Sequence, residues 1–370
     1  MEAVAAFTDT YLPTVNGVTY TIRTWRQRWR DRGGRMDVVY PEATGYVPEA
    51  GERPVTSFGF PFYAGYRYAL PAVPRPVHDV DVVHVHTPFT LGLAGLRLAR
   101  AEDLPLVASY HTPTGEYTDY IAPRPVSSLL RGVSEYWERA FLDRADVVLV
   151  PSEVTREHVV GQVGVTTRVE TLPNGVDVER FRPVETAGFR ARHGLDTLDP
   201  DRPLVGYTGR HGHEKRLDLL VEAAAGLDAT VVLAGDGPAR SDLERLAEDT
   251  DVDVRFLGFL ERDELPAFYA SLDVFAFPSP VETQGIVALE AMACGTPVVA
   301  AEAGALTETV EDGVTGLHFE PGDVEGFRQA IRRSLDERDR LGEACLDRRE
   351  TTSVAVAVDR LAALYGSLVE

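Results

Sequence analysis

The stretch Leu204-Val205-Gly206-Tyr207-Thr208-Gly209-Arg210-His211-Gly212-His213-Glu214-Lys215 joins an apolar strand to a glycine-containing loop with two fixed cations. Lys215 is the single lysine among 37 lysines and arginines. An ammonium is a compact point charge on a flexible stem and binds phosphate oxygens well. Open α/β sheets place diphosphates at the carboxyl ends of strands in this way. The stretch therefore predicts a diphosphate site in an α/β fold. The simpler interpretation makes Lys215 a solvated residue at the start of a helix.

Strands and helices alternate on both sides of this stretch. Short apolar strands separated by helices indicate βαβ units and a parallel sheet. A length of 370 residues is typical of two domains. The expected strands are 3–7, 36–40, 80–86, 106–110, 147–150 and 169–172, then 204–207, 230–234, 254–257, 274–277, 297–300 and 316–319. The expected helices include 19–31, 91–101, 133–145, 153–161, 285–294 and 354–368.

The pattern predicts two Rossmann-like α/β domains that face each other across a cleft. We expect the N-terminal domain over 1–182 and the C-terminal domain over 203–350. Residues 183–202 are polar and rich in glycine and proline, which favours a linker with a short helix. Residues 351–370 form a last helix that we expect to pack back on the N-terminal domain.

Composition restricts the class of protein. The net charge is −21, with acids spread along the whole chain. Together with the near-absence of lysine, this is typical of a halophilic protein from a high-salt cytoplasm, and it argues against a nucleic-acid partner. Cys294 and Cys345 give neither a disulfide framework nor a metal spacing. We find no signal peptide and no run of eighteen apolar residues, so the expected location is cytoplasmic.

Two glutamates, Glu282 and Glu290, stand eight residues apart where a loop enters a helix. Eight residues at helical rise span about 12 Å, on the order of the separation between the sugar and the ribose of a nucleotide-diphosphate sugar. One carboxylate could accept hydrogen bonds from sugar hydroxyls and the other from ribose hydroxyls. The alternative is a loop acid and a polar residue on a buried helix. The small apolar neighbours of Glu290 favour a buried acid that needs partners.

A series of short motifs follows along the chain. They are Phe7-Thr8-Asp9-Thr10-Tyr11-Leu12-Pro13-Thr14-Val15-Asn16-Gly17-Val18, His84-Val85-His86-Thr87-Pro88, Tyr110-His111-Thr112-Pro113, Pro173-Asn174-Gly175-Val176-Asp177, the Gly209-Arg210 to Glu214-Lys215 loop, Gly235-Asp236-Gly237-Pro238 and the Glu282-x7-Glu290 pair. Taken together and in this order, the motifs resemble those of retaining GT-B glycosyltransferases of family 4. The resemblance covers about residues 5 to 325 and is closest to transferases of membrane diacylglycerols and to mannosyltransferases.

The resemblance implies roles for particular residues. Arg210 and Lys215 would clamp the diphosphate and stabilise it as the leaving group. Glu282 would hold sugar hydroxyls, and His111 would face the donor sugar, although a histidine at a strand end is often only structural. The family commonly has an aromatic residue where Gln284 stands, so the sugar contacts there differ. The remaining donor-binding residues would be Gly17, Asn174, Phe259, Leu260, Thr283, Gln284, Gly285, Ile286, Glu290 for the ribose, and Thr296.

The resemblance also implies a reaction without a cofactor or metal. The expected donor is a UDP- or GDP-hexose, and the expected acceptor is a hydroxyl of a membrane lipid or glycan. An Asp79-Val80-Asp81 sequence looks like a metal motif, but it begins a strand and so lies at the wrong end. His84 and His86 should share one face of their strand, and two histidines alone make a weak metal site.

Two segments could bring the protein to the inner face of a membrane as a peripheral contact. Helix 19–31 carries Ile22, Trp25 and Trp29 at helical spacing beside several arginines. This stripe either packs on the sheet or lies on an anionic bilayer. The aromatic stretch 58–68 could insert into lipid, bind a soluble acceptor or fold inward. At about 1 M salt the Debye length is roughly 3 Å, so docking would depend on inserted apolar groups.

Other functions fit the sequence less well. A nicotinamide dehydrogenase would need a Gly-x-Gly-x-x-Gly after its first strand, and here Gly235-x-Gly237 is followed by Arg240. A non-catalytic partner subunit would have lost a cation or a glutamate of the site. A transferase with a soluble or polysaccharide acceptor and a sugar-nucleotide epimerase of the same fold remain as alternatives.

Overall fold

A computed structural model describes residues 1–59, 67–111 and 126–370, and within 126–131 it describes the helical backbone only. The chain divides into two compact units. The first comprises Met1–Gly175 and Val354–Glu370, and the second comprises Val176–Ser353. The aromatic stretch expected at 58–68 lies partly outside the described residues.

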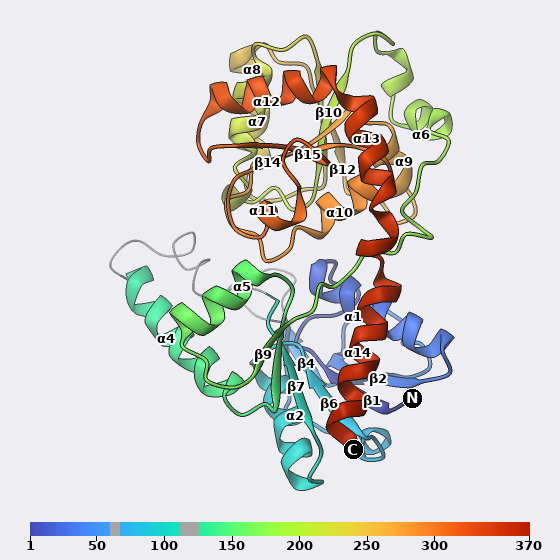
Figure 1. Ribbon diagram of the computed structural model, residues 1–370, viewed down its shortest axis with the longest axis vertical. Coiled ribbons are helices and arrows are strands. Elements are labelled where there is room, and N and C mark those ends of the chain that lie inside the picture. Colours follow the sequence, from blue (N-terminus) through green and yellow to red (C-terminus); the bar gives the residue numbers. More distant parts are fainter. Residues whose placement is uncertain (60–66, 112–125) are drawn as a thin grey trace. The chain divides into compact units, whose positions relative to one another are not determined.

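The first unit is built on a seven-stranded parallel sheet in the order β3-β2-β1-β6-β7-β8-β9, with a small antiparallel β4-β5 hairpin (Figure 1). Without the hairpin this is the Rossmann order, and the chain reverses direction across the sheet between β1 and β6. The strands are β1 Ala3–Phe7, β2 Arg35–Pro41, β3 Glu52–Val55, β4 Ser57–Gly59, β5 Arg67–Ala69, β6 Val82–Val85, β7 Leu106–Ser109, β8 Val147–Val150 and β9 Val169–Thr171.

Helices cover both faces of this sheet. The α-helices are α1 Gly17–Asp31, α2 Thr90–Ala101, α4 Val126–Leu142, α5 Glu153–His158 and α14 Val354–Val369, with a 3-10 turn at Arg75–His78 and a π turn at Val159–Val163. Helix α2 packs on one face. Helices α1 and α14 pack together on the other, which brings the end of the chain back to its first unit.

The second unit has a six-stranded parallel sheet in the order β12-β11-β10-β13-β14-β15. Here the chain reverses direction across the sheet between β10 and β13. Its strands are β10 Leu204–Thr208, β11 Thr230–Ala234, β12 Val254–Gly258, β13 Val274–Phe277, β14 Val298–Ala301 and β15 Gly316–Phe319. Its α-helices are α6 Ala187–Arg192, α7 Leu217–Ala224, α8 Arg240–Thr250, α9 Leu265–Ala270, α10 Ile286–Ala293, α11 Leu306–Thr309, α12 Val324–Asp336 and α13 Arg338–Asp347, with 3-10 turns at Leu195–Thr197, His213–Lys215 and Arg349–Thr352. The α/β class and the parallel sheets are as predicted.

The structure divides the chain at Gly175 and Val354, whereas the sequence pattern suggested 182, 202 and 350. The segment expected as a linker packs on the second unit, because Phe189 and Leu195 are buried in that unit's core. The ring of Phe189 meets Phe268 of α9 edge to face at 6.3 Å between centroids. These two apolar residues attach an otherwise polar segment to the second unit, and the composition of the segment did not indicate this.

The position of helix α1 decides between the two interpretations of its apolar stripe, packing on the sheet or docking on a membrane. Trp25 and Trp29 are buried at 2% and 0% exposure in the core shared with α14. Arg26 is also buried and pairs with Glu52 at 3.5 Å. The membrane interpretation of the α1 stripe is therefore wrong, since its apolar face is already occupied.

Candidate functional site

The loops after β10 and β11 are held in close contact at the carboxyl edge of the second sheet. The Gly209 amide donates to Ala234 and the His211 amide to Asp236, at 3.1 and 2.9 Å. Gly235 has φ +109°, and a Cβ on it would lie 2.0 Å from the Gly209 carbonyl oxygen. Only glycine allows this approach. The backbones of the two loops are therefore packed tightly together, and the loop after β10 carries Arg210 and Lys215.

Lys215 and Glu282 meet across 67 positions of sequence. The Lys215 Nζ donates to Glu282 Oε1 at 2.6 Å, and both side chains are 14% exposed. Lys215 ends the 3-10 turn before α7, and Glu282 lies in the loop between β13 and α10. The contact joins the two loops on either side of the point where the chain reverses direction, which is where open α/β sheets bind ligands.

Arg210 and Tyr207 lie in the same cluster of charges. The Arg210 guanidinium donates to Glu214 Oε1, and Glu214 is buried. The Tyr207 hydroxyl is buried, which raises its pKa; the charges of Lys215, Glu282, Glu214 and Arg210 act on it as well. The structure thus gathers Arg210, Lys215 and Glu282, three of the four predicted catalytic residues, around one phenol.

The residues after Glu282 form the entrance to α10. Gly285 has φ +75°, which favours glycine, and a Cβ there would lie 2.6 Å from a methyl of Leu306. Gln284 is buried, and its carbonyl accepts from the Thr309 hydroxyl. Thr283 and Ile286 are partly exposed. This fixed turn places the first amides of α10 next to Glu282.

Glu290 is the buried acid that its apolar neighbours predicted. It is 2% exposed, and burial raises the pKa of its carboxyl. Tyr269 donates to Oε2 at 2.8 Å and Arg262 pairs with Oε1 at 3.2 Å. Each oxygen keeps a second lone pair, so the carboxylate can still accept from another hydroxyl.

Three other predicted donor-binding residues of the second unit lie in different surroundings. Thr296 is buried and donates to the Tyr269 carbonyl at 2.7 Å. It therefore helps to fix the backbone of Tyr269, whose hydroxyl donates to Glu290. Phe259 and Leu260 follow β12; the first is 58% exposed and the second is buried in the core. Of these two residues, Phe259 therefore offers an exposed side chain at this edge.

In the first unit, His111 and Asn174 are linked through two buried rings. His111 Nε2 lies 3.0 Å from His86 Nδ1. Trp25 lies beside His86 at 6.1 Å between centroids and donates from Nε1 to the Asn174 carbonyl at 2.8 Å. These predicted site residues therefore share one region at the carboxyl ends of β6, β7 and β9.

Gly17 is the first residue of α1 and not part of the preceding loop, which is a correction to the predicted helix start. Asn16 caps the helix by accepting from the Thr19 amide at 2.9 Å. An exposed glycine at this position leaves the backbone amides of the first turn accessible to an anion.

The partners of two predicted site residues were not predicted from the sequence. Arg262 and Tyr269, which satisfy Glu290, were not singled out, and Glu214, which satisfies Arg210, was named only as part of its loop motif. The available signal was burial: a carboxylate in an apolar helix requires donors, but sequence does not say which ones.

No group of three or more histidines, cysteines or acids suited to a metal ion occurs in the described part of the chain. The acids of the Asp79-Val80-Asp81 sequence have structural partners. Asp81 accepts from the Ala3 amide at 2.7 Å, and Asp79 pairs with Arg35 at 3.6 Å.

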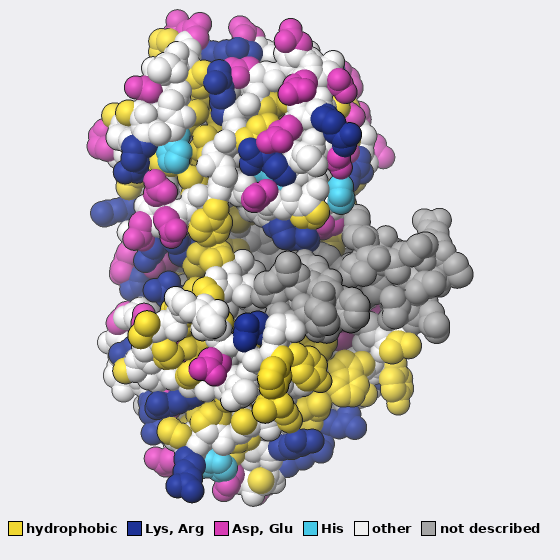
Figure 2. All heavy atoms as spheres, turned by 180° about the vertical axis from the view of Figure 1, so that it is seen from behind, with side chains coloured by type: hydrophobic (Ala, Val, Ile, Leu, Met, Phe, Trp, Pro, Cys, Tyr) yellow, Lys and Arg dark blue, Asp and Glu magenta, His cyan; other side chains and the backbone are white. Residues whose placement is uncertain are grey.

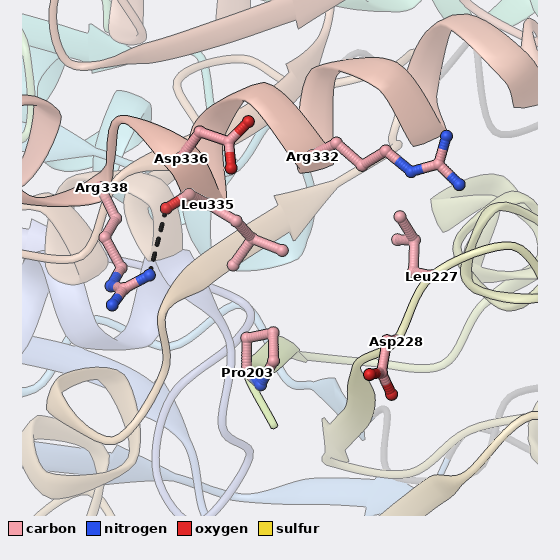
Figure 3. Close-up of a pocket in the computed structure, with 7 residues that line it drawn as sticks. All are labelled: Pro203, Leu227, Asp228, Arg332, Leu335, Asp336 and Arg338. Carbon is pink, nitrogen blue, oxygen red and sulfur yellow. Dashed lines mark hydrogen bonds between the residues drawn. The ribbon is translucent and has the colours of Figure 1, made fainter. Parts of the chain in front are cut away.

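A broad hollow of the second unit lies at the opposite edge of its sheet (Figure 3). Pro203 lines it and directly precedes β10, so the hollow is at the amino ends of the strands. Arg338 donates to the Leu335 carbonyl there at 3.2 Å and pairs with Asp273. Its mixed, internally paired charges give no reason to place the chemistry at this edge.

Two family models match the chain. Residues 15–180 match "Glycosyltransferase Family 4", and residues 195–350 match "Glycosyl transferases group 1". Together they cover most of both units.

Curated relatives include three that match over most of this chain. A sulfoquinovosyl transferase of Arabidopsis thaliana is 35% identical, and the match covers 88% of this chain and 65% of the relative. A GDP-mannose-dependent α-mannosyltransferase of Mycolicibacterium smegmatis is 33% identical, with 92% and 91% covered. An α-monoglucosyldiacylglycerol synthase of Streptococcus pneumoniae is 29% identical, with 87% and 76% covered.

Solved structures share the fold. Sucrose-phosphate synthase from Thermosynechococcus elongatus superposes with a TM-score of 0.81 at 23% identity, with 99% of both chains covered. An Anabaena protein, HepE, in complex with UDP-glucose gives 0.78 at 21% identity, with 99% of this chain and 100% of HepE covered.

Proposed function

Because the chain belongs to the GT-B glycosyltransferases of family 4, we propose that it moves a hexose from UDP- or GDP-hexose to a lipid hydroxyl with retention of configuration. The observation that carries the proposal is the Lys215–Glu282 contact of 2.6 Å at the carboxyl edge of the second sheet. It joins a phosphate-binding cation to a carboxylate that can hold a sugar.

Lys215 and Arg210 would take over the negative charge of the departing nucleotide diphosphate. Electrostatic stabilisation of developing charge is usually the largest single protein contribution to such a step. Arg210 keeps further N–H donors beside its bond to Glu214. In this proposal the two cations do the work that a metal ion does elsewhere. In the first unit, the accessible amides at Gly17 would offer backbone donors to an anion.

The sugar would rest against Glu282 and the first turn of α10, through Thr283, Gln284, Gly285 and Ile286. The acceptor oxygen attacks the anomeric carbon on the face from which the diphosphate leaves. The carbon–oxygen bond to phosphate breaks, the new glycosidic bond forms on the same side, and the acceptor proton passes to a phosphate oxygen. Holding both substrates in the productive orientation lowers the activation barrier further.

Glu290 would accept from ribose hydroxyls, with Phe259 and Leu260 beside the base. We also propose that Asn174 and His111 of the first unit contact a substrate. The buried Arg262 and Tyr269 keep the Glu290 carboxylate in one orientation. A rigid acceptor of hydrogen bonds discriminates well between sugars that have and lack the hydroxyl.

One of the relatives supports a lipid acceptor, since it is named an α-monoglucosyldiacylglycerol synthase. The described part of the chain contains no helix long and apolar enough to cross a bilayer. We propose a peripheral contact of the protein with the inner face of the membrane.

The surface that supports membrane contact is the α4 face, which we define as Val133, Tyr136 and Trp137. These side chains are 60%, 73% and 40% exposed and recur at helical spacing. Trp137 is anchored by its bond to the Pro88 carbonyl at 2.8 Å. Figure 2 shows hydrophobic side chains gathered where α4 lies in the first unit. Tyrosine and tryptophan are the side chains that favour a bilayer interface.

The function is tested with a panel of nucleotide sugars. UDP-glucose, UDP-galactose and GDP-mannose are first scored by thermal shift, and the binding donors are then incubated with diacylglycerol, phosphatidylinositol and soluble sugar acceptors. We expect transfer to lipid, and an α-linked product by NMR from an α-linked donor. Transfer to soluble acceptors alone would contradict the lipid proposal, and a β-linked product would contradict retention.

Membrane contact is tested by co-sedimentation with anionic vesicles. We expect Val133→Ser combined with Tyr136→Ser to release the protein from vesicles, and Val47→Ser, at an 84% exposed site, to leave binding unchanged. Equal vesicle binding by wild type and the α4 double variant would rule out this surface.

A further inference from the structure

Three histidine rings, of which two are buried, form a contacting series at the carboxyl ends of β6 and β7. The rings of His84 and His86 stack at 4.1 Å between centroids, and those of His86 and His111 at 5.3 Å with an interplanar angle of 14°. His84 is 0% exposed and His86 3%, whereas His111 is partly exposed. Only His111 is therefore accessible to a substrate.

His84 is fixed on both sides. Its Nδ1 lies 2.6 Å from the Tyr365 hydroxyl of α14, and its Nε2 lies 2.8 Å from the Ser109 hydroxyl of β7. Both ring nitrogens are therefore engaged, so the ring cannot flip without losing two hydrogen bonds. His86 stacks on this fixed ring, with Trp25 at 6.1 Å on another side.

The His86–His111 contact constrains both rings. His86 Nδ1 and His111 Nε2 are 3.0 Å apart, a normal hydrogen-bond distance. A hydrogen bond between two imidazoles requires one nitrogen to donate and the other to accept. Burial lowers the pKa of His111 to about 4, so near neutral pH its ring is uncharged. One shared proton then determines the state of both rings, because each neutral imidazole carries a single N–H.

We propose that His86 is a positioning residue that sets the ring orientation and the tautomer of His111. His86 is too deeply buried to touch a substrate, and it acts by holding His111 Nε2, which leaves His111 Nδ1 in one defined state for a substrate. This inference rests on the proposed role of His111. Second partners of this kind fix the tautomer of functional histidines in other sites.

Two substitutions of His86 separate the hydrogen bond from the packing. His86→Phe keeps an aromatic ring for the stack and removes the nitrogen. His86→Asn keeps an amide close to the position of Nδ1. With UDP-glucose or GDP-mannose as donor, we expect His86→Phe to lower kcat about tenfold with little change in donor KM, the loss of roughly one hydrogen bond in the transition state. We expect His86→Asn to recover most of the activity.

Imidazole 15N NMR reads the tautomer directly in the full chain. We expect a single His111 tautomer in the wild type and in His86→Asn, and a mixture in His86→Phe. Tyr365→Phe serves as the control, since it removes a bond to His84 and leaves the His86–His111 contact intact. It should reduce stability while the His111 signals and kcat stay as in the wild type.

The outcomes separate this inference from the proposed function. If His86→Phe retains the wild-type His111 tautomer and the wild-type kcat, the inference is overturned. If His111→Ala itself transfers sugar at the wild-type rate, the proposed role of His111 fails, while the NMR comparison still decides whether His86 orients it.

Discussion

At the scale of single residues, Lys215 shows how one side chain can combine two tasks. It neutralises Glu282 at 2.6 Å, where both side chains are only 14% exposed, and in the proposed function it also takes up the charge of the departing diphosphate. A guanidinium is larger and planar and needs a different spacing from its partner. The chain uses arginine at every other basic position, so the retention of lysine here points to a fit that arginine does not meet.

We expect Lys215→Ala to lower kcat about 100-fold or more, the usual effect of losing one donor to a developing negative charge. Lys215→Arg should also be clearly impaired, since the guanidinium does not fit beside Glu282. Steady-state transfer rates and circular dichroism together measure activity and folding. Arg245→Lys, at an exposed site of α8, is the matched control and should be fully active. Full activity of Lys215→Arg would show that the site needs only a positive charge.

The Glu290 cluster makes a prediction about stability. Arg262→Leu leaves a buried carboxylate without its cation, and removal of one partner of such a pair costs about 3–5 kcal/mol. Tyr269→Phe removes a single hydrogen bond and should cost about 1–2 kcal/mol. Urea unfolding of the two variants gives the comparison. A loss of under 1 kcal/mol for Arg262→Leu would mean that Glu290 takes up a proton when it loses its partner.

The sequence was informative where residues are neighbours in the chain. Apolar runs and glycines predicted most strands to within two residues, and the spacing of Glu282 and Glu290 predicted the entrance to α10. The partners of Glu290 come from other elements: Arg262 lies before α9 and Tyr269 within it, 28 and 21 positions from Glu290. Such contacts follow from sheet order, which a single sequence specifies only through its fold class. The short strands β3, β4 and β5 were also not predicted. Strand β3 lies at the edge of the seven-stranded sheet, and β4 and β5 pair with each other outside it.

At the scale of elements, β6, β7 and α14 are joined by neutral histidines. Burial lowers the pKa of His84 to about 3 and of His111 to about 4, and the pKa of His86 falls as well. In the unfolded chain a histidine takes up a proton near pH 6.5. The unfolded state therefore binds more protons than the folded state between these pKa values, and stability must fall as the pH drops through that window.

We expect the free energy of unfolding of the first unit to be constant above about pH 7 and to fall by up to about 1.4 kcal/mol per pH unit for each histidine between about pH 6.5 and 4.5. Trp25, Trp29 and Trp137 all lie in the first unit, so tryptophan fluorescence during urea unfolding reports on this unit alone. His84→Asn should give a shallower dependence. A flat profile for the wild type would show that the rings take up protons inside the fold.

At the scale of the whole molecule, the charge of −21 must be screened. Like charges spread over a surface destabilise the folded state through mutual repulsion. The Debye length is about 10 Å at 0.1 M salt and about 3 Å at 1 M. We therefore expect the Tm to rise as KCl increases from 0.1 to 2 M, measured by calorimetry. A matched NaCl series controls for the cation, and a Tm that falls with salt would contradict the halophilic interpretation.

The return of α14 to the first unit predicts how the chain can be cut. The side chains of α14 that are buried with Trp29 against the sheet are Val358, Leu361, Leu364 and Tyr365, and the rings of Tyr365 and Trp29 are 5.3 Å apart between centroids. Each large buried apolar side chain contributes about 1.5–3 kcal/mol, so the four together approach the total stability of a domain, about 5–15 kcal/mol. The second unit has a core of its own.

We therefore expect fragment 176–353 to unfold cooperatively by itself, and fragment 1–175 to lack a stable fold until a peptide of residues 354–370 is added. Circular dichroism follows the first fragment, and tryptophan fluorescence follows the second during titration with the peptide. A peptide carrying Leu361→Asp is the matched control and should not restore the fold, since a charge would enter the core beside Trp29. Cooperative unfolding of 1–175 without the peptide would show that α14 covers a core that is already complete.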